Sequence, residues 1–304
     1  WETDTVELSL PGKIEDLLVS TGMQNANSVA TTGSTNKPLH SQASPPPLGT
    51  GEPCPSHIDY QSVCGALLWI ARMGRPDIMH RSAELARFMH SPGADHAKEL
   101  MHLLKYIKGT QHDKLVYKRD PAMNWDNYAF LGYVDSDFAP DYGDAYRNMK
   151  STMGWIFTQN DVAVSWRSRK EPVFADSTAA AEFIGAADAS KQAVWVRRWY
   201  TDMGHPQMHP TPLFEDNESC MKLVKNYCGH DKIKHLDIRH AVVREHHAKG
   251  MIEMHDVPDR DQLADVFTKV KPGPQTRRMR KWMLTGAVPA DCTVAPSSVL
   301  KMHG

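Results

Sequence analysis

Four acidic residues stand at places from which their carboxylates could meet. Asp135 ends an expected strand, and Asp216 ends a later strand just before a helix. Glu182 lies among alanines and other apolar residues near the start of a long helical pattern, where a carboxylate is costly to bury unless it has a function. Asp265 stands near the start of the last helical pattern. The four acids come from four separate elements and could converge on one point.

Converging carboxylates repel one another unless a cation neutralises them, and hard divalent cations such as Mg²⁺ prefer oxygen ligands. Two such ions about 3.5–4 Å apart can activate water and stabilise a leaving oxygen in phosphodiester cleavage. We therefore expect two Mg²⁺ ions, for which Mn²⁺ could substitute, bound by Asp135, Glu182, Asp216 and Asp265. An alternative stays open for three of them: Asp135 and Asp216 as turn or helix-capping residues, and Asp265 as a surface acid.

The elements that must position these acids alternate in type. Strands are expected at 130–135, 152–158, 162–166, 211–216 and 251–257, with a hairpin turn at 159–161. Helices are expected at 177–203, from 217 onward, at 232–249 and at 261–270. This order predicts an α/β fold with a mixed sheet flanked by helices. Ligand sites in open α/β sheets form beyond the carboxyl ends of strands, where Asp135 and Asp216 are placed.

Composition divides the rest of the chain. A short strand and helix precede a proline-rich stretch that reads as a linker, and three helical patterns follow it. Basic residues without acids occur from Lys269 to Lys281, where the helical pattern decays, so a poorly ordered tail is expected. The expected parts are 1–35, the linker 36–57, a helical subdomain 58–125, an α/β domain 126–272 and the tail 273–304.

Global composition excludes two classes of protein. The net charge is −1, so any nucleic-acid-binding surface must be local. No apolar run approaches the ~20 residues of a membrane span, so no membrane is expected as a partner. The odd number of cysteines, 5, fits a reducing compartment better than a disulfide framework.

Several longer motifs occur in a fixed order. They read GRPDI at 74–78, LKYIKGT at 104–110, LGYVDSDFA at 131–139, KSTMGWIF at 150–157, VSWRSRK at 164–170, DNES at 216–219, KHLDIRH at 234–240 and QLADVFTK at 262–269. In this order, over residues 1 to about 282, the chain resembles the C-terminal part of the Pol polyprotein of copia-type LTR retrotransposons. The resemblance covers the end of the reverse transcriptase, the connection region and the ribonuclease H domain.

The resemblance implies a ribonuclease H-like fold, with a mixed five-stranded sheet flanked by helices and preceded by a small helical connection subdomain. It implies Mg²⁺-dependent endonucleolytic hydrolysis of the RNA strand of RNA–DNA hybrids during reverse transcription. Asp135, Glu182, Asp216 and Asp265 would be both the catalytic residues and the metal ligands. The implied partners are the hybrid and the polymerase domain of the same polyprotein, whose catalytic acids this sequence lacks. The implied location is a virus-like particle in the cytoplasm, with the nucleus as a second location.

One departure from the family pattern leaves a second function open. The family usually has a glutamate where Ala180 stands, two residues before Glu182. The alternative to an active nuclease is therefore a degenerate, non-catalytic retroelement remnant that binds nucleic acid or packs against a reverse transcriptase.

Further residues are candidates for contact with nucleic acid. A basic strip next to the acids would suit a phosphate backbone, with an ordinary solvated helix face as the alternative. His255 is either a product-release residue or a surface histidine, and the surface role is favoured. Trp166, Trp195 and Trp199 are expected in the core rather than as base-stacking platforms, because their spacing fits strand and helix interiors. The basic strip consists of Lys222, Lys225, Lys232, Lys234, Arg239 and Arg244.

Overall fold

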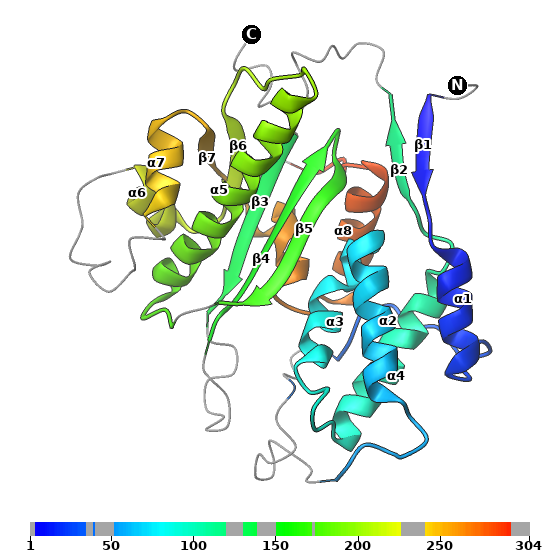
Figure 1. Ribbon diagram of the computed structural model, residues 1–304. Coiled ribbons are helices and arrows are strands. Elements are labelled where there is room, and N and C mark those ends of the chain that lie inside the picture. The colour runs from blue at the N-terminus through cyan, green and yellow to red at the C-terminus, as the bar shows by residue number, and fades with distance from the viewer. Residues whose placement is uncertain are drawn as a thin grey trace.

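A mixed five-stranded sheet forms the centre of the molecule (Figure 1). The computed structural model describes residues 4–34, 39, 52–119, 130–138, 150–171, 174–225 and 241–292. The strands are β3 (Phe130–Asp137), β4 (Thr152–Gln159), β5 (Val162–Lys170), β6 (Thr211–Glu215) and β7 (Ile252–Asp256). Their spatial order is β5-β4-β3-β6-β7; the first three are antiparallel neighbours, and β6 and β7 continue the sheet in parallel with β3. The expected ribonuclease H-like α/β sheet is confirmed.

Local sequence explains the antiparallel half of the sheet. Seven of the eight residues of β3 are buried, which fits a strand covered on both faces. The predicted hairpin turn joins β4 to β5 through Asn160 and Asp161, whose φ angles are 49° and 66°. Positive φ at both central residues is the geometry of a type I′ turn, which asparagine and aspartate tolerate. The turn pairs Gln159 of β4 with Val162 of β5. On its other side β4 pairs with β3, with Gly154 opposite Asp135.

Three helices cover one face of the sheet: α5 (Thr178–Asp202), α6 (Glu218–Lys225) and α7 (Val242–Ala248) (Figure 1). The Ser177 hydroxyl caps α5 by accepting a hydrogen bond from the amide of Ala180. The predicted helix 232–249 is observed only as α7, and residues 226–240 lie outside the described part of the chain. Neither α5 nor any other helix within the described ranges is both long and apolar enough to cross a membrane.

The other face packs against the N-terminal half and the C-terminal helix (Figure 1). One hydrophobic core runs from Leu67 and Leu104 through Tyr133 and Phe214 of the sheet to Trp282. The predicted division between 58–125 and 126–272 is therefore crossed by a continuous core. The elements on this side are α2 (Tyr60–Met73), η1 (Pro76–Ile78), α3 (Met79–Ala86), α4 (Ala94–Gly109), η5 (Asp259–Asp261), η6 (Leu263–Phe267) and α8 (Gly273–Thr285).

The N-terminal segment also belongs to this side. Strand β1 (Thr5–Leu8) pairs antiparallel with β2 (Leu115–Lys118), and α1 (Pro11–Ser20) contacts α2 and α4. The predicted linker 36–57 lies mostly outside the described residues, apart from Leu39 and 52–57.

Two predictions for the C-terminal part are wrong. The segment 261–270 forms short 3₁₀ turns rather than an α-helix. The predicted poorly ordered tail begins instead with α8, whose Met279, Trp282 and Met283 are buried in the core. These apolar residues at helical spacing outweigh the repulsion of the basic run, which occupies the rest of the helix surface. Residues 293–304 lie outside the described part of the chain.

Gly154 allows η6 to lie directly against β4. A Cβ at this position would lie 2.4 Å from the Cβ of Phe267 and 3.0 Å from its carbonyl carbon. We expect Gly154→Ala to lower the free energy of unfolding by roughly 1–3 kcal/mol, measured by urea denaturation, because η6 must shift. Gly65→Ala is the control, since nothing lies within 4 Å of the added carbon. Equal stability of the two variants would contradict this packing.

Candidate metal centre

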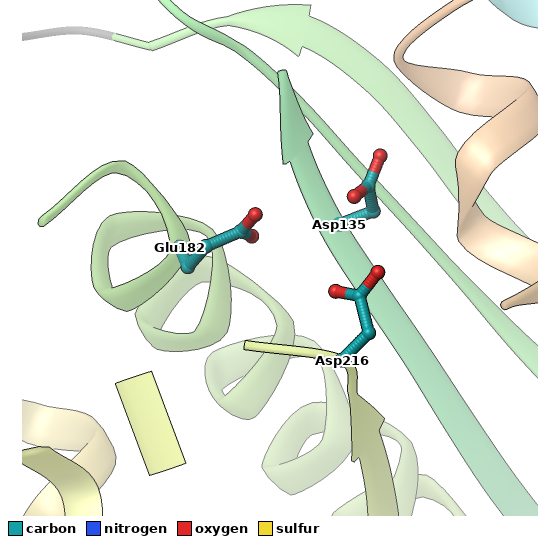
Figure 2. A group of neighbouring side chains, drawn as sticks. All are labelled: Asp135, Glu182 and Asp216. Atoms are coloured by element: carbon teal, nitrogen blue, oxygen red, sulfur yellow. The ribbon is translucent and has the colours of Figure 1, made fainter. Parts of the chain in front are cut away.

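Three carboxylates from three elements converge at one end of the sheet (Figure 2). Asp135 comes from β3, Glu182 from the first turns of α5, and Asp216 from the residue after β6. One oxygen from each carboxylate lies within 4.8 Å of the others. Figure 2 shows the three side chains pointing toward a common space. We call these three residues the acid triad.

The local fold explains this convergence. Strands β3 and β6 are parallel neighbours with Tyr133 opposite Phe214, so their carboxyl ends, and hence Asp135 and Asp216, meet. Helix α5 comes close to β3 beside them, because Gly185 has no side chain: a Cβ there would lie 2.6 Å from the hydroxyl of Ser136. The hydroxyl of Ser136 also donates a 3.2 Å hydrogen bond to the Ala181 carbonyl.

Two of the three members of the acid triad are buried. Asp135 is 3% exposed and Glu182 is 4% exposed. Burial and the neighbouring Asp265 raise the pKa of Asp135 to about 7, and burial and Glu215 raise the pKa of Glu182 well above its usual value. Oε2 of Glu182 is buried and has no hydrogen-bond partner among the described residues. Clustered carboxylate oxygens of this kind fit a hard divalent cation such as Mg²⁺.

Asp265, the fourth predicted ligand, lies nearby but outside the acid triad. Its buried carboxylate pairs with Lys269, at 2.6 Å, and with Lys271. Burial lowers the pKa of Lys269, but the charges of Asp135 and Asp265 raise it above its usual value. The ammonium group of Lys269 therefore stays charged. The Thr268 hydroxyl donates a hydrogen bond to Asp135 and so ties η6 to the site. Two lysines thus already neutralise Asp265.

Two buried acids beside the site were not predicted. Glu215 precedes Asp216, is fully buried, and accepts a 3.0 Å hydrogen bond from the amide of Asn217. Burial, and to a smaller extent the nearby charge of Asp216, raises the pKa of Glu215 well above its usual value. Alternation along β6 gives the signal that was missed, because Glu215 shares the α5-facing side with Leu213. Glu171, at the end of β5, is the second acid.

Glu171 should make stability depend on pH. Burial raises its pKa to about 8, against about 4.3 for an unfolded glutamate. The folded chain therefore holds a proton between these values that the unfolded chain has lost, and stability falls as the pH rises. Glutamine cannot ionise, so Glu171→Gln should remove this loss of stability. We expect the difference in the free energy of unfolding between the variant and the wild type to be roughly 2–4 kcal/mol more favourable to the variant at pH 8 than at pH 5, measured by urea denaturation. Glu15→Gln is the control, because Glu15 is exposed. If the free energy of unfolding depended on pH in the same way in both variants, the prediction would be wrong.

The predicted basic strip is only partly assembled. Lys222 and Lys225 are exposed on α6, and Lys222 pairs with Glu218 at 2.7 Å. Arg244 does not fit the predicted phosphate contact: it is buried, donates a 2.7 Å hydrogen bond to the Leu223 carbonyl and lies over the ring of Phe183. The remaining predicted members, which lie outside the described residues, are Lys232, Lys234 and Arg239.

His255 and the three tryptophans also have defined places. His255 lies on β7, where its Nε2 is 3.2 Å from Glu253 and its ring packs near Phe214. Trp166 is half-buried and donates a 2.9 Å hydrogen bond to the Ala71 carbonyl. The prediction that Trp195 and Trp199 lie in the core is wrong, because these side chains are 60% and 50% exposed.

Comparison with known proteins identifies relatives along most of the chain. No family model matches it. The retrovirus-related Pol polyprotein from transposon TNT 1-94 of Nicotiana tabacum is 30% identical over 266 residues, 87% of this chain and 19% of the relative. The one from transposon RE2 of Arabidopsis thaliana is 29% identical over 254 residues, 84% of this chain and 16% of the relative. This chain is a relative of the copia-type Pol polyproteins.

The Pol-related chain spans less than a fifth of the length of these relatives. Among solved structures, the N-terminal RNase H domain of rv2228c from Mycobacterium tuberculosis, fused to maltose binding protein, is similar to 46% of this chain. The match covers 89% of that structure at 11% identity and a TM-score of 0.30, a similarity too low to inform the site.

Proposed function

We propose that the chain is a Mg²⁺-dependent ribonuclease H that hydrolyses the RNA strand of RNA–DNA hybrids during reverse transcription. The observation that carries the proposal is the acid triad, whose carboxylate oxygens lie within 4.8 Å of one another. The relationship to Pol polyproteins supports a hybrid as substrate and a reverse transcriptase of the same polyprotein as partner. It also supports a virus-like particle, in the cytoplasm or the nucleus, as the location.

In this proposal the acid triad binds the cation, and neighbouring residues fix the orientation of the triad's side chains. Bound Mg²⁺ would supply an activated water and stabilise the leaving oxygen of the phosphodiester. Thr268 fixes the orientation of Asp135 through its hydrogen bond. Asp265 could bind a second ion only if that ion displaced Lys269 and Lys271 from its carboxylate. Lys222 and Lys225 are exposed on α6, which begins just after Asp216, so they could contact the phosphate backbone of the hybrid.

Cleavage of end-labelled substrates by the full chain tests this proposal. With Mg²⁺ or Mn²⁺ we expect cutting of the RNA strand of an RNA–DNA hybrid, and no cutting with EDTA. Double-stranded DNA and the DNA strand of the hybrid should stay intact. A folded protein that binds the hybrid without cutting it would overturn the nuclease and favour the non-catalytic alternative.

A further inference from the structure

The outward face of α5 carries two exposed tryptophans. Trp195 and Trp199 are 60% and 50% exposed, and their i, i+4 spacing places them one above the other on the same side of the helix. Lys191 stands one turn before Trp195, and Arg198 lies beside Trp199; both are exposed. Scattered exposed apolar residues are ordinary, but two exposed tryptophans one helical turn apart with cations beside them are suited to binding a ligand.

The edge strand of the sheet extends this surface. Strand β5 lies at one end of the strand order and is joined to α5 by a 3.1 Å hydrogen bond from Gln192 to Ser165. Arg167 and Arg169 of β5 lie 3.6 Å and 2.7 Å from Asp188 of α5. We define the α5–β5 surface as Arg167, Lys191, Trp195, Arg198 and Trp199.

The charges of this surface favour an anionic occupant. The side chain of Arg167 is 46% exposed, whereas that of Asp188 is only 15% exposed and already contacts two arginines. Asp202, the last residue of α5, is the exposed acid on the same side of the helix. Lys191 and Arg198 are the exposed cations beside the tryptophans, and the two arginines of β5 outweigh Asp188, so the surface carries more positive than negative charge. Phosphates would bind the cations, and unpaired bases would stack on the indole rings.

We propose that the α5–β5 surface binds an unpaired nucleic-acid strand. Its position relative to the nuclease site rests on the proposed function. Trp199 lies about 25 Å beyond Glu182 along the helix axis, at a rise of ~1.5 Å per residue. This length corresponds to about seven nucleotides of a stacked strand at ~3.4 Å per nucleotide. A hybrid cut at the acid triad would thus reach the tryptophans with a single-stranded extension of about that length.

Fluorescence anisotropy with labelled single-stranded oligonucleotides tests the proposal on the full chain. Stacking on an aromatic side chain contributes ~1–3 kcal/mol per base, so Trp195→Ala with Trp199→Ala should weaken binding at least about tenfold. Replacing both residues by phenylalanine should restore much of the affinity. Trp69→Ala is the matched control, because Trp69 is 45% exposed on α2, away from this surface. Arg198→Glu should weaken binding and lower its dependence on salt concentration.

Hybrids with and without a ten-nucleotide extension, in RNA and DNA versions, separate this surface from the nuclease site. The double alanine variant should lose the extra affinity that the extension gives, and should cut blunt hybrids as the wild type does. If the wild type does not cut hybrids but its binding of single strands still depends on the tryptophans, the proposed nuclease function is wrong and the proposed α5–β5 surface stands. Unchanged single-strand binding in a folded double variant would overturn the proposal. A change in self-association alone, seen by sedimentation, would assign the tryptophans to a protein contact instead.

Discussion

Asp135→Asn should abolish Mg²⁺-dependent cleavage of the RNA–DNA hybrid and leave the protein folded. The substitution keeps the shape of the side chain but removes a negative oxygen from the acid triad, in which Asp135 is buried. A buried cation depends strongly on the charge of its ligands. We expect the rate constant to fall at least about 10³-fold, equivalent to ~4 kcal/mol in the activation free energy. Single-turnover cleavage with saturating enzyme measures this effect.

The matched control for this prediction is Asp137→Asn, two residues further along the same strand. Asp137 is half-buried and is not a member of the acid triad. Its rate constant should stay within about threefold of the wild type. Hybrid binding by Asp135→Asn, measured without Mg²⁺, should be equal to or tighter than that of the wild type because repulsion of the phosphates is reduced. If both variants lost activity equally, the site would not centre on Asp135.

Glu182→Gln should have opposite effects on the metal-free and metal-bound protein. Burial, Glu215 and Asp135 raise the pKa of Glu182, so its ionised form is unfavourable in the folded state. The neutral amide removes this cost, and we expect the metal-free protein to gain roughly 1–3 kcal/mol at pH 8. The same change removes a ligand and should weaken Mg²⁺ binding at least about 100-fold. Thermal unfolding with and without Mg²⁺, together with calorimetric titration, measures both effects.

Mg²⁺ should stabilise the wild type against unfolding but not the Glu182→Gln variant. A cation that binds only the folded protein at about 100 times its dissociation constant stabilises it by ~2.7 kcal/mol. The wild type should show this gain, and Glu182→Gln should lack it. Glu218→Gln is the control, because Glu218 lies exposed on α6 and pairs with Lys222. Equal stabilisation of the wild type and Glu182→Gln by Mg²⁺ would show that the cation binds elsewhere.

The parts of the site that local sequence determines were predictable. Asp135 lies two residues before the end of β3 rather than at its end, and Asp216 directly follows β6. Apolar neighbours near the start of a long helix singled out the buried Glu182. The predicted hairpin turn at 159–161 and the predicted long helix from 177 both follow from residue types and spacing over a few residues. The pattern of strands and helices predicted the α/β class, and the resemblance to Pol polyproteins implied the ribonuclease H-like form of it.

The parts that depend on contacts between distant segments were not predictable. The basic run after Lys269 suggested a disordered tail, yet Trp282 reaches a core built from residues far upstream. Asp265 was expected to bind metal, but Lys271 lies close enough to neutralise it, because the 3₁₀ turns of η6 bring the chain back toward the carboxylate. Trp195 was expected in the core, but it lies on the outward side of α5, because Val196 and Tyr200 are among the residues that occupy the buried side of the helix.

Anomalous diffraction from crystals of the full chain soaked in Mn²⁺ tests the central claim most directly. The claim is that Asp135, Glu182 and Asp216 together hold a divalent cation. We expect an anomalous peak within coordination distance of all three carboxylates in the wild type, and none at this position in Asp135→Asn. A second peak beside Asp265 would show that the cation displaces Lys269. Mn²⁺-dependent cleavage in solution without a peak at the acid triad would contradict the account.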